Sequence, residues 1–435
     1  MKRVLIIAYY WPPAGGPGVQ RWLHFVRNFE QFGIEPIVYV PENPMYPIED
    51  ASLSEKVPDT VTVLKHPIKE PYRWAQWFSK KKTKSLSSGI ISEKKPSLLE
   101  RILLYVRGNF FIPDARVGWV DPSVSFLKDY LSETPVDVVV TTGPPHSLHL
   151  IGKKLKAACH IPWVADFRDP WTTIHYHKSL RLTKASEAKH KKLEAEILNT
   201  ANRITVTSKV TKHEFQTITS RPIDVVTNGF EEVVSGEEYS LDKTFSIVHI
   251  GSLLTERNPQ ILWKVLRELK EAHPEFQKHL ELKLVGQYSQ EVLDDLTEND
   301  LIKNTTLVGY VPHKEAVAYQ RKAQVLLLVE MDREETKAII PGKLFEYLSA
   351  RRPIIAMGPD GSDVQTILQE TKAGAYLLYS EEEKLKNKVW DAFKLYRTQD
   401  LLVPEADISS FSRSELTRKM ASILTSVTSE TPAQP

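Results

Sequence analysis

The chain has 435 residues, more than one hydrophobic core usually serves, so we expect two domains of similar size. Its 41% hydrophobic and 26% charged residues are close to globular averages, which excludes a disordered chain. A net charge of +2 excludes nucleic-acid binding through the overall field, and the single cysteine, Cys159, excludes an intrachain disulfide or a thiolate zinc cluster. The first apolar run, Val4 to Ala8, is too short for a signal peptide or a membrane span, so we expect a cytoplasmic protein.

The first half of the chain has the pattern of a parallel α/β domain. The run from Val4 to Ala8 is typical of a strand buried on both faces. A loop rich in Gly and Pro follows it, and apolar residues at helical spacing in Val19 to Phe32 precede a strand at Ile37 to Val40, which completes a βαβ unit. Further strands are expected at 61–65, 136–140, 162–166, 203–207 and 223–226, and helices near 122–133, 147–158, 182–200 and 208–219.

One segment, Lys69 to Arg107, interrupts this alternation. It holds ten basic and three acidic residues, a local charge of +7, and aromatic residues such as Trp74, Trp77 and Phe78 lie among them. A basic, aromatic and amphipathic insertion can lie on an anionic lipid surface, at about 1 kcal/mol per basic residue near the lipid. The alternative is a solvated loop and a helix packed on its own domain. The segment thus predicts either a membrane contact or a surface excursion.

A second series of alternating elements begins with the buried strand at Phe245 to Ile250. Strands are expected at 281–285, 305–308, 324–329, 353–357 and 374–378, and helices at 259–272, 289–298, 313–321, 342–350, 363–371 and 381–396. Strict alternation predicts a second doubly wound parallel sheet, with the polar stretch Glu231 to Thr244 as the linker. The fold class is therefore α/β, with Rossmann-like domains at 1–235 and 236–407, and residues 426–435 form a polar tail.

Two stretches could hold phosphate at the carboxyl ends of these strands. Backbone amides around Gly16, just before the first helix, can approach phosphate oxygens without obstruction by a β-carbon, although a purely structural turn is the alternative. The spacing is neither G-x-G-x-x-G nor G-x-x-x-x-G-K-[ST], which disfavours an ordinary dehydrogenase or P-loop enzyme. The second stretch, Pro341 to Leu348, opens a helix whose first turn presents Lys343 and Glu346 on neighbouring parts of one face. A lysine there can neutralise a phosphate, and a carboxylate can accept both ribose hydroxyl protons.

The stretch from Pro341 to Pro353 resembles the nucleotide-binding helix of family 4 glycosyltransferases, in particular the bacterial subset reading P-x-K-[LIV]-x-E-Y-[LM]-A-x-[GR]-[RK]-P. The resemblance covers nearly the whole chain and implies the GT-B fold, with two Rossmann-like domains facing across a cleft. It implies a donor site formed by Gly16, Gly251, Arg257, Lys343 and Glu346, in which Arg257 and Lys343 stabilise the departing diphosphate. It also implies that the helix at 408–425 crosses back to the first domain.

In the first domain, the stretches Thr141 to His149 and Trp163 to Trp171 resemble the cleft-facing loops of this family. His146 is a candidate to orient or deprotonate the acceptor hydroxyl, and a structural histidine is the alternative. Asp166, Arg168 and Asp169 are candidates to contact sugar or acceptor, with Asp169 preferred and also assigned a catalytic role; a loop-fixing ion network among them is the alternative.

One departure from the family concerns its Glu-x7-Glu signature. With Glu346 as the second glutamate, the first position falls on Ala338. The ribose-binding role therefore transfers to this chain, while the role of the first glutamate toward the sugar does not. The possible substitutes are Glu330, Asp332, Glu334 and Glu335, among which spacing does not choose.

The resemblance implies transfer with retention of configuration from a nucleotide-sugar donor to a glycan or lipid-linked acceptor, in cell-surface polysaccharide synthesis. The chain has no D-x-D pair, so we expect no cofactor and no essential metal. The expected location is the cytoplasm or the inner face of the membrane, with no nucleic-acid partner. Two alternatives from other classes stay open: a sugar-nucleotide epimerase of the same fold and a catalytically silent scaffold on the membrane surface.

Overall fold

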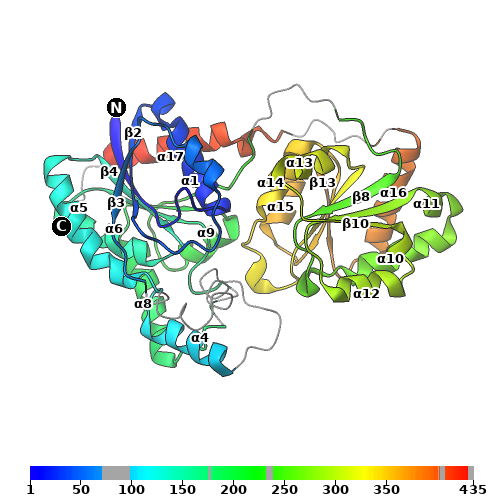
Figure 1. Ribbon diagram of the computed structural model, residues 1–435, viewed down its shortest axis with the longest axis horizontal. Coiled ribbons are helices and arrows are strands. Elements are labelled where there is room, and N and C mark those ends of the chain that lie inside the picture. Colours follow the sequence, from blue (N-terminus) through cyan, green and yellow to red (C-terminus); the bar gives the residue numbers. More distant parts are fainter. Residues whose placement is uncertain are drawn as a thin grey trace. The chain divides into compact units, whose positions relative to one another are not determined.

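A computed structural model describes residues 1–70, 98–174, 177, 179–231, 239–399, 401 and 407–429. The chain forms two compact units (Figure 1). Unit 1 consists of Met1–Asn228 together with the C-terminal segment from Arg413, and unit 2 consists of Gly229–Ser412. Each unit contains one wholly parallel sheet covered by helices on both faces. The predicted class, two Rossmann-like α/β domains, is confirmed.

The sheet of unit 1 has the strand order β3-β2-β1-β4-β5-β6-β7. Its strands are β1 (Lys2–Ile7), β2 (Ile34–Pro41), β3 (Thr62–His66), β4 (Val138–Gly143), β5 (Trp163–Phe167), β6 (Arg203–Val206) and β7 (Ile223–Val225). The helices are α1 (Pro17–Asn28), α4 (Leu98–Phe110), α5 (Val120–Glu133), α6 (Ser147–Cys159), α8 (Lys184–Thr200), α9 (Lys209–Gln216) and α17 (Arg413–Ser429), with short 3-10 turns η1 (Phe29–Phe32), η2 (Ala51–Lys56) and η3 (Val117–Trp119).

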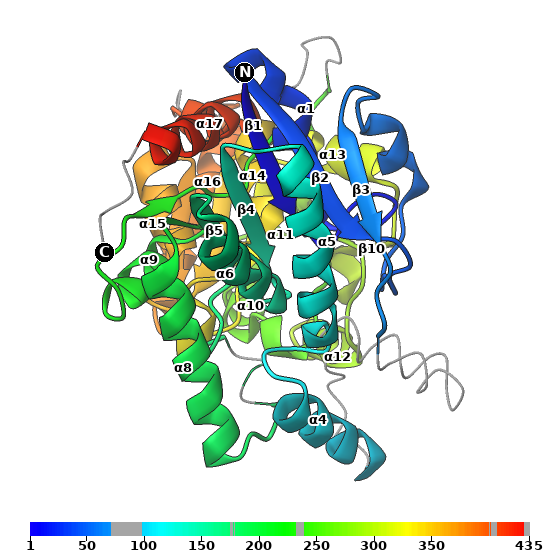
Figure 2. The same cartoon turned by 90° about the vertical axis from the view of Figure 1, so that its left-hand side faces the viewer.

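Successive residues of β1 point to opposite faces of this sheet, and both faces are buried. Leu5 and Ile7 pack against α5, α6, α8 and α9, whereas Val4 and Ile6 pack against α1, η1 and α17. In Figure 2, α5 and α6 lie in front of the strands. The uninterrupted apolar run at the start of the chain is therefore explained by a strand that has two dry faces.

Unit 2 has the strand order β10-β9-β8-β11-β12-β13. Its strands are β8 (Phe245–Ile250), β9 (Leu280–Val285), β10 (Thr305–Gly309), β11 (Val325–Val329), β12 (Ile354–Gly358) and β13 (Gly374–Leu378). The helices are α10 (Gln260–Ala272), α11 (Pro274–His279), α12 (Gln290–Glu298), α13 (His313–Lys322), α14 (Gly342–Ala350), α15 (Asp363–Thr371) and α16 (Glu382–Arg397), with 3-10 turns η4 (Thr255–Arg257), η5 (Ile302–Asn304), η6 (Glu334–Thr336) and η7 (Ser409–Phe411). α10, α12 and α16 pack on one face of the sheet, and α14 and α15 on the other.

The boundaries differ from the predicted ones in three places. Unit 1 ends at Asn228, before the predicted boundary at residue 235. The terminal helix α17 begins at Arg413 rather than 408 and extends to Ser429, so the first residues of the predicted tail are helical. Its apolar residues Leu416, Met420 and Leu424 are buried in the same cluster as α1, which is why this segment belongs to unit 1. The helix α11 is an addition that the pattern did not predict.

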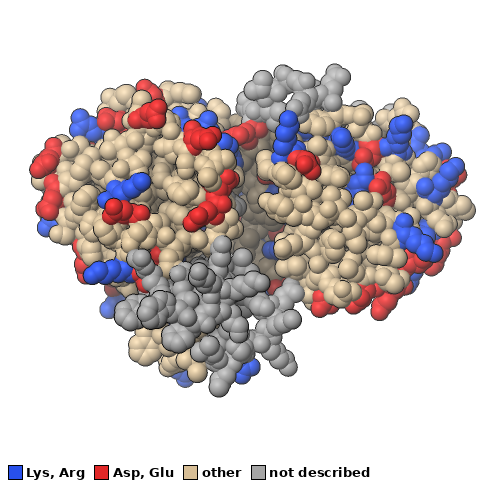
Figure 3. All heavy atoms as spheres, viewed as in Figure 1, with Lys and Arg blue, Asp and Glu red and all other residues tan. Residues whose placement is uncertain are grey.

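The insertion at 69–107 is described only in part. Trp74, Trp77 and Phe78 lie outside the described residues, whereas its last part belongs to α4. On the face of the molecule shown in Figure 3, the described Lys and Arg side chains are interspersed with Asp and Glu in both units. This mixed surface agrees with the balanced charge of the whole chain.

Candidate functional site

In unit 2, the predicted donor residues gather at the carboxyl ends of the strands, where open parallel sheets bind their ligands. Gly251 directly follows β8, Arg257 ends the next turn, and Lys343 lies in the first turn of α14. A β-carbon on Gly251 would stand 3.2 Å from Lys343 Nζ, and Gly251 has φ of 108°, a conformation that favours glycine. Gly251 therefore lets the lysine ammonium rest against the end of β8.

The Lys343 ammonium is largely shielded from solvent. Burial and then the Arg257 charge lower the pKa of Lys343, Glu346 opposes them, and the net result is a pKa of about 7. Among the described residues, no carboxylate oxygen lies within ion-pair distance of the Lys343 ammonium. Arg257 and Lys343 are neighbouring cations, and the lysine is poorly hydrated. An anionic ligand would relieve the repulsion between their charges.

Glu346 is held by α13. Gln320 Nε2 donates a hydrogen bond of 2.7 Å to Glu346 Oε2, and His313 Nε2 lies 3.4 Å from Oε1. The Glu346 side chain is 38% exposed, so its carboxylate can meet a ligand from solvent. The sequence pattern did not assign Gln320 or His313, because both lie on a different helix from Glu346.

Glu330 was one of four proposed substitutes for the missing first glutamate. It is 4% exposed, and its carboxyl group contacts the Ser362 hydroxyl at 3.0 Å and the Tyr376 hydroxyl at 2.8 Å. Burial raises its pKa to about 8, so at neutral pH it is mostly uncharged. Glu330 is therefore a core group of unit 2 that ties β11 to β13. Of the other substitutes, Asp332 is exposed and Glu334 pairs with Lys337 at 2.7 Å.

In unit 1, Arg168 fixes the loop that bears His146. Its backbone N–H and its Nε donate to Gly143 O at 3.0 and 3.2 Å, and its Nη2 donates to Pro144 O. A β-carbon on Gly18 would stand 1.7 Å from Arg168 Nη1, so the guanidinium lies directly against the first turn of α1. Gly16, with φ of 100°, precedes that turn. The glycine loop and Arg168 are thus brought together, while Asp169, next along the chain, is half-buried.

His146 precedes the first residue of α6 and is 6% exposed. Its ring stacks on Trp171 with centroids 4.8 Å apart, and neither ring nitrogen has a hydrogen-bond partner among the described residues. Burial and then His149 hold its pKa well below the usual range, so the imidazole is neutral. One nitrogen of a neutral ring is a bare acceptor, so the ring is suited to accept a hydrogen bond from a ligand hydroxyl rather than to take up its proton.

The position of Asp166 does not support the predicted contact with sugar or acceptor. It is fully buried, and its carboxylate accepts from Arg21 at 3.1 Å, Trp22 at 2.8 Å, Thr142 at 2.8 Å and Thr205 at 2.7 Å. The predicted alternative, an ion network, describes it better, but the cation is Arg21 of α1 and not Arg168. The reason is that Asp166 lies within β5, where its side chain points into the packed face beneath α1.

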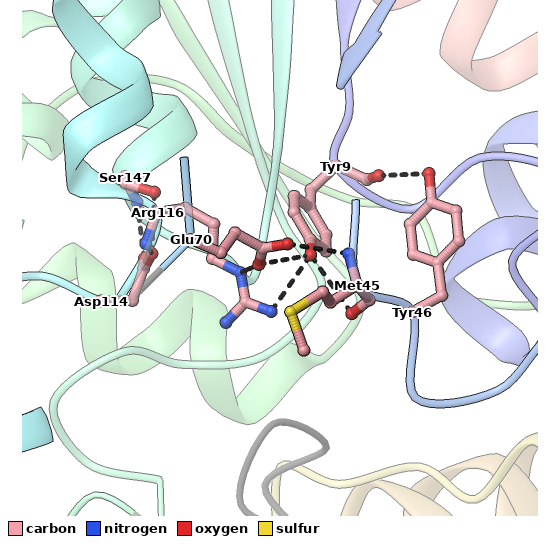
Figure 4. Close-up of polar contacts among 7 residues, drawn as sticks. All are labelled: Tyr9, Met45, Tyr46, Glu70, Asp114, Arg116 and Ser147. Atoms are coloured by element: carbon pink, nitrogen blue, oxygen red, sulfur yellow. Dashed lines mark hydrogen bonds and ion pairs between the residues drawn. The ribbon is translucent and has the colours of Figure 1, made fainter. Parts of the chain in front are cut away.

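A second buried network was not predicted. Tyr9, Glu70 and Arg116 point toward one another (Figure 4): the Tyr9 hydroxyl donates to Glu70 at 2.7 Å, and Arg116 pairs with Glu70 at 3.2 Å. Nearby, Asp114 accepts from the backbone N–H and the hydroxyl of Ser147, both at 2.8 Å, and so caps α6 directly after His146. This network joins the ends of β1 and β3 to the segment after α4.

In the part of the chain that the structure describes, no cluster of His, Cys, Asp and Glu has a geometry that could hold a metal ion. None of the described helices combines the length and apolar character needed to cross a bilayer.

Residues 244–394, all within unit 2, match the family described as glycosyl transferases group 1. No curated protein sequence matches the chain.

The matches to solved structures extend over both units. A glycosyltransferase from Rickettsia africae ESF-5 has a TM-score of 0.62 at 11% identity, covering 99% of each chain. A putative UDP-N-acetylglucosamine 2-epimerase from Listeria monocytogenes has a TM-score of 0.55 at 12% identity, covering 99% of this chain and 98% of that one. A mutant of S. aureus TarM in complex with Fondaparinux, alpha-GlcNAc-glycerol and UDP has a TM-score of 0.57 at 11% identity, covering 98% and 100%. The fold is thus that of GT-B enzymes, and with the family match of unit 2 the chain is a glycosyltransferase.

Proposed function

We propose that this glycosyltransferase takes a sugar from a nucleoside-diphosphate sugar and transfers it, with retention of configuration, to a glycan or lipid-linked acceptor. The proposed setting is cell-surface polysaccharide synthesis at the inner face of the membrane, with the type of site found in family 4 enzymes. The observation that carries the donor assignment is the grouping of Gly251, Arg257, Lys343 and Glu346 at one sheet edge of unit 2.

In this proposal, Arg257 and Lys343 meet the diphosphate. Their positive charges stabilise the negative charge that develops as the diphosphate leaves. The donor phosphate helps to take the acceptor proton, as transfer with retention in this family implies. No essential metal is expected, because two fixed cations can carry the charge that a divalent ion would otherwise meet.

Glu346 would accept the hydroxyl protons of the ribose. Gln320 supports this role because its amide holds one carboxylate oxygen and thereby sets the direction of the other. In unit 1, Gly16 would approach the donor, and His146, Arg168 and Asp169 are the residues proposed to face sugar or acceptor.

The test of the donor site is the variant Glu346→Ala. It should weaken binding of the donor nucleotide about 10-fold or more, because a charged hydrogen-bond partner is worth about 1.5–3 kcal/mol. Calorimetry measures this affinity after a thermal-shift screen of UDP, GDP, ADP and TDP sugars has identified the donor. Glu334→Ala is the matched control, because Glu334 is 79% exposed and lies in the same unit. Unchanged affinity in Glu346→Ala would refute the placement of the ribose.

A structure titled a putative epimerase has a similar fold, so the reaction itself needs a direct assay. Incubation of the pure protein with radiolabelled donor, without acceptor, should give slow release of free sugar by hydrolysis. Conversion of the donor into its epimer would favour the epimerase. If neither reaction occurs and the donor does not bind, a catalytically silent scaffold would be favoured.

A lipid contact is proposed for α4. Ile102, Tyr105, Val106 and Phe110 are 52%, 42%, 36% and 72% exposed and lie along one side of the helix, while Leu104 on the other side is buried. Gly108, also on the packed side, lies against Leu180 and Leu182. Arg101 and Arg107 lie on the same helix, so an apolar stripe accompanied by positive charge fits an anionic bilayer surface.

Sedimentation with vesicles tests this contact. The wild-type protein should sediment with vesicles containing anionic lipid at low salt, less at high salt, and poorly with neutral vesicles. Ile102→Ser with Phe110→Ser should abolish sedimentation. Leu395→Ser is the control, because Leu395 is 44% exposed but belongs to unit 2. A wild-type protein that stays in solution with anionic vesicles at low salt would refute the proposal.

A further inference from the structure

His249 is a buried histidine at the end of β8 for which the sequence suggested no role. It is 1% exposed, and its Nδ1 lies 3.0 Å from the carbonyl oxygen of Leu327. A carbonyl oxygen can only accept a hydrogen bond, so Nδ1 carries the proton. In the neutral imidazole, Nε2 is then a bare acceptor.

That acceptor faces the lysine of the donor site. Lys343 Nζ lies 3.4 Å from His249 Nε2, a long hydrogen bond in which the ammonium donates. The same ammonium lies against Gly251, two residues after His249. The end of β8 thus positions the Lys343 ammonium: Gly251 leaves room for it, and His249 Nε2 accepts its hydrogen bond.

The backbone of the lysine is fixed by the same part of the sheet. Tyr347, one turn after Lys343, accepts from the backbone N–H of Ile250 at 3.0 Å and contacts Leu327 O at 3.4 Å. The carbonyl of Leu327 therefore meets both His249 and Tyr347. Since β8 and β11 are neighbours in the sheet, α14 and the imidazole are positioned against one rigid element.

The imidazole stays neutral in this place. Burial and then the Lys343 charge hold the pKa of His249 well below its usual range, and Arg257 acts in the same direction. Hydrogen bonds with the backbone of Leu327 and Ser252 oppose this shift without reversing it. A carboxylate here would neutralise the lysine, whereas a neutral acceptor leaves its positive charge for a ligand.

We propose that His249 is a positioning residue for the diphosphate of the donor: its Nε2 holds the Lys343 ammonium over Gly251 without neutralising it. This inference rests on the proposed function, because it concerns the same donor site. It assigns to β8 a part in nucleotide binding that acts through Lys343.

Two conservative variants test the inference. In His249→Asn the amide nitrogen can replace Nδ1 and keep the bond to Leu327 O, but nothing replaces Nε2. In His249→Gln the amide oxygen reaches the place of Nε2 and can accept from Lys343, but the bond to Leu327 O is lost. A positioning role therefore predicts that Asn is the more harmful change, and a merely structural role predicts that Gln is.

The probe is whichever of UDP, GDP, ADP and TDP raises the melting temperature of the wild-type protein most, and calorimetry gives its affinity. We expect His249→Asn to weaken binding about 10-fold and His249→Gln to remain within about threefold of the wild type. Equal affinities, the reverse order, or an Asn variant that no longer unfolds cooperatively would overturn the inference. A wild-type protein that binds none of the four nucleotides would instead refute the proposed function.

Discussion

Arg116 Nε lies 3.2 Å from Glu70 Oε1, and the two side chains are only 5% and 1% exposed. Glu70 lies at the start of the insertion and Arg116 follows α4, so this buried ion pair closes the base of the insertion. Tyr9 completes the contact with a hydroxyl that donates to the carboxylate and a ring that lies under the guanidinium, 4.6 Å from its centre.

Removal of the cation should therefore destabilise unit 1. Arg116→Leu leaves the Glu70 carboxylate buried without its partner, which typically costs about 3–5 kcal/mol. Chemical denaturation monitored by tryptophan fluorescence measures the loss. Lys154→Leu is the control, because its pair with Asp121 is exposed and should contribute little. Equal losses in the two variants would show that burial does not control the strength of this pair.

Asp166→Asn should act on stability and not on the donor site. The amide keeps the shape of the side chain but cannot neutralise Arg21. Its nitrogen replaces one carboxylate oxygen and so cannot accept from the two groups that donate to that oxygen, either Arg21 and Thr205 or Trp22 and Thr142. We expect a loss of about 3–5 kcal/mol in the free energy of unfolding. Nucleotide affinity at a temperature where the variant is folded should be unchanged. If the variant has normal stability but no transferase activity, the result would instead support a contact between Asp166 and the acceptor.

Acid should destabilise unit 1 through its buried histidines. His146, His149, His177 and His190 lie around Trp171, and burial lowers the pKa of each; that of His149 falls to about 3 and that of His177 to about 4. A histidine whose pKa is lower in the folded state binds protons preferentially when unfolded. Its contribution is therefore complete above pH 6.5 and is lost as the pH falls below that value.

Each such histidine can remove up to about 1.4 kcal/mol per pH unit. Denaturation midpoints at pH 7.5, 6 and 5 measure the slope, and His149→Gln should reduce it. The comparison with the wild type is necessary because Glu194, whose pKa burial raises to about 7, titrates in the opposite sense. A slope that the variant leaves unchanged would contradict the assignment to the histidines.

The affinity for the donor diphosphate should fall as the pH rises above 7. The free site has a Lys343 pKa of about 7, and a bound diphosphate stabilises the charged form, so binding takes up a proton at higher pH. The dissociation constant should rise by up to about 10-fold per pH unit between pH 7 and 9, where the ionisation of the ligand is complete.

Lys343→Arg should bind with little dependence on pH in this range, because arginine stays charged. Calorimetry at pH 7, 8 and 9, in buffers of different ionisation enthalpy, measures both the affinity and the protons taken up. A wild-type affinity that does not change between pH 7 and 9 would mean that the lysine is already fully charged in the empty site.

Local patterns in the sequence determined the elements of this protein. The apolar run of β1, and Pro341-Gly342 at the start of α14, depend on neighbouring residues alone, so this strand and this helix could be placed without coordinates. The spacing of Lys343 and Glu346 within one helical turn is also local. This is why the fold class was predictable and why Lys343 and Glu346 could be proposed as neighbours.

Only the tertiary structure decided what surrounds those residues. Asp166 lies in a stretch that resembles a cleft-facing loop, but it meets Arg21 of α1, far from it in the sequence. Glu346 likewise accepts from Gln320 on α13. The neutral acceptor for Lys343 is His249, which lies on another strand far earlier in the chain. Such pairs depend on how helices and strands pack side by side, and that packing is set by the whole core rather than by any window of sequence.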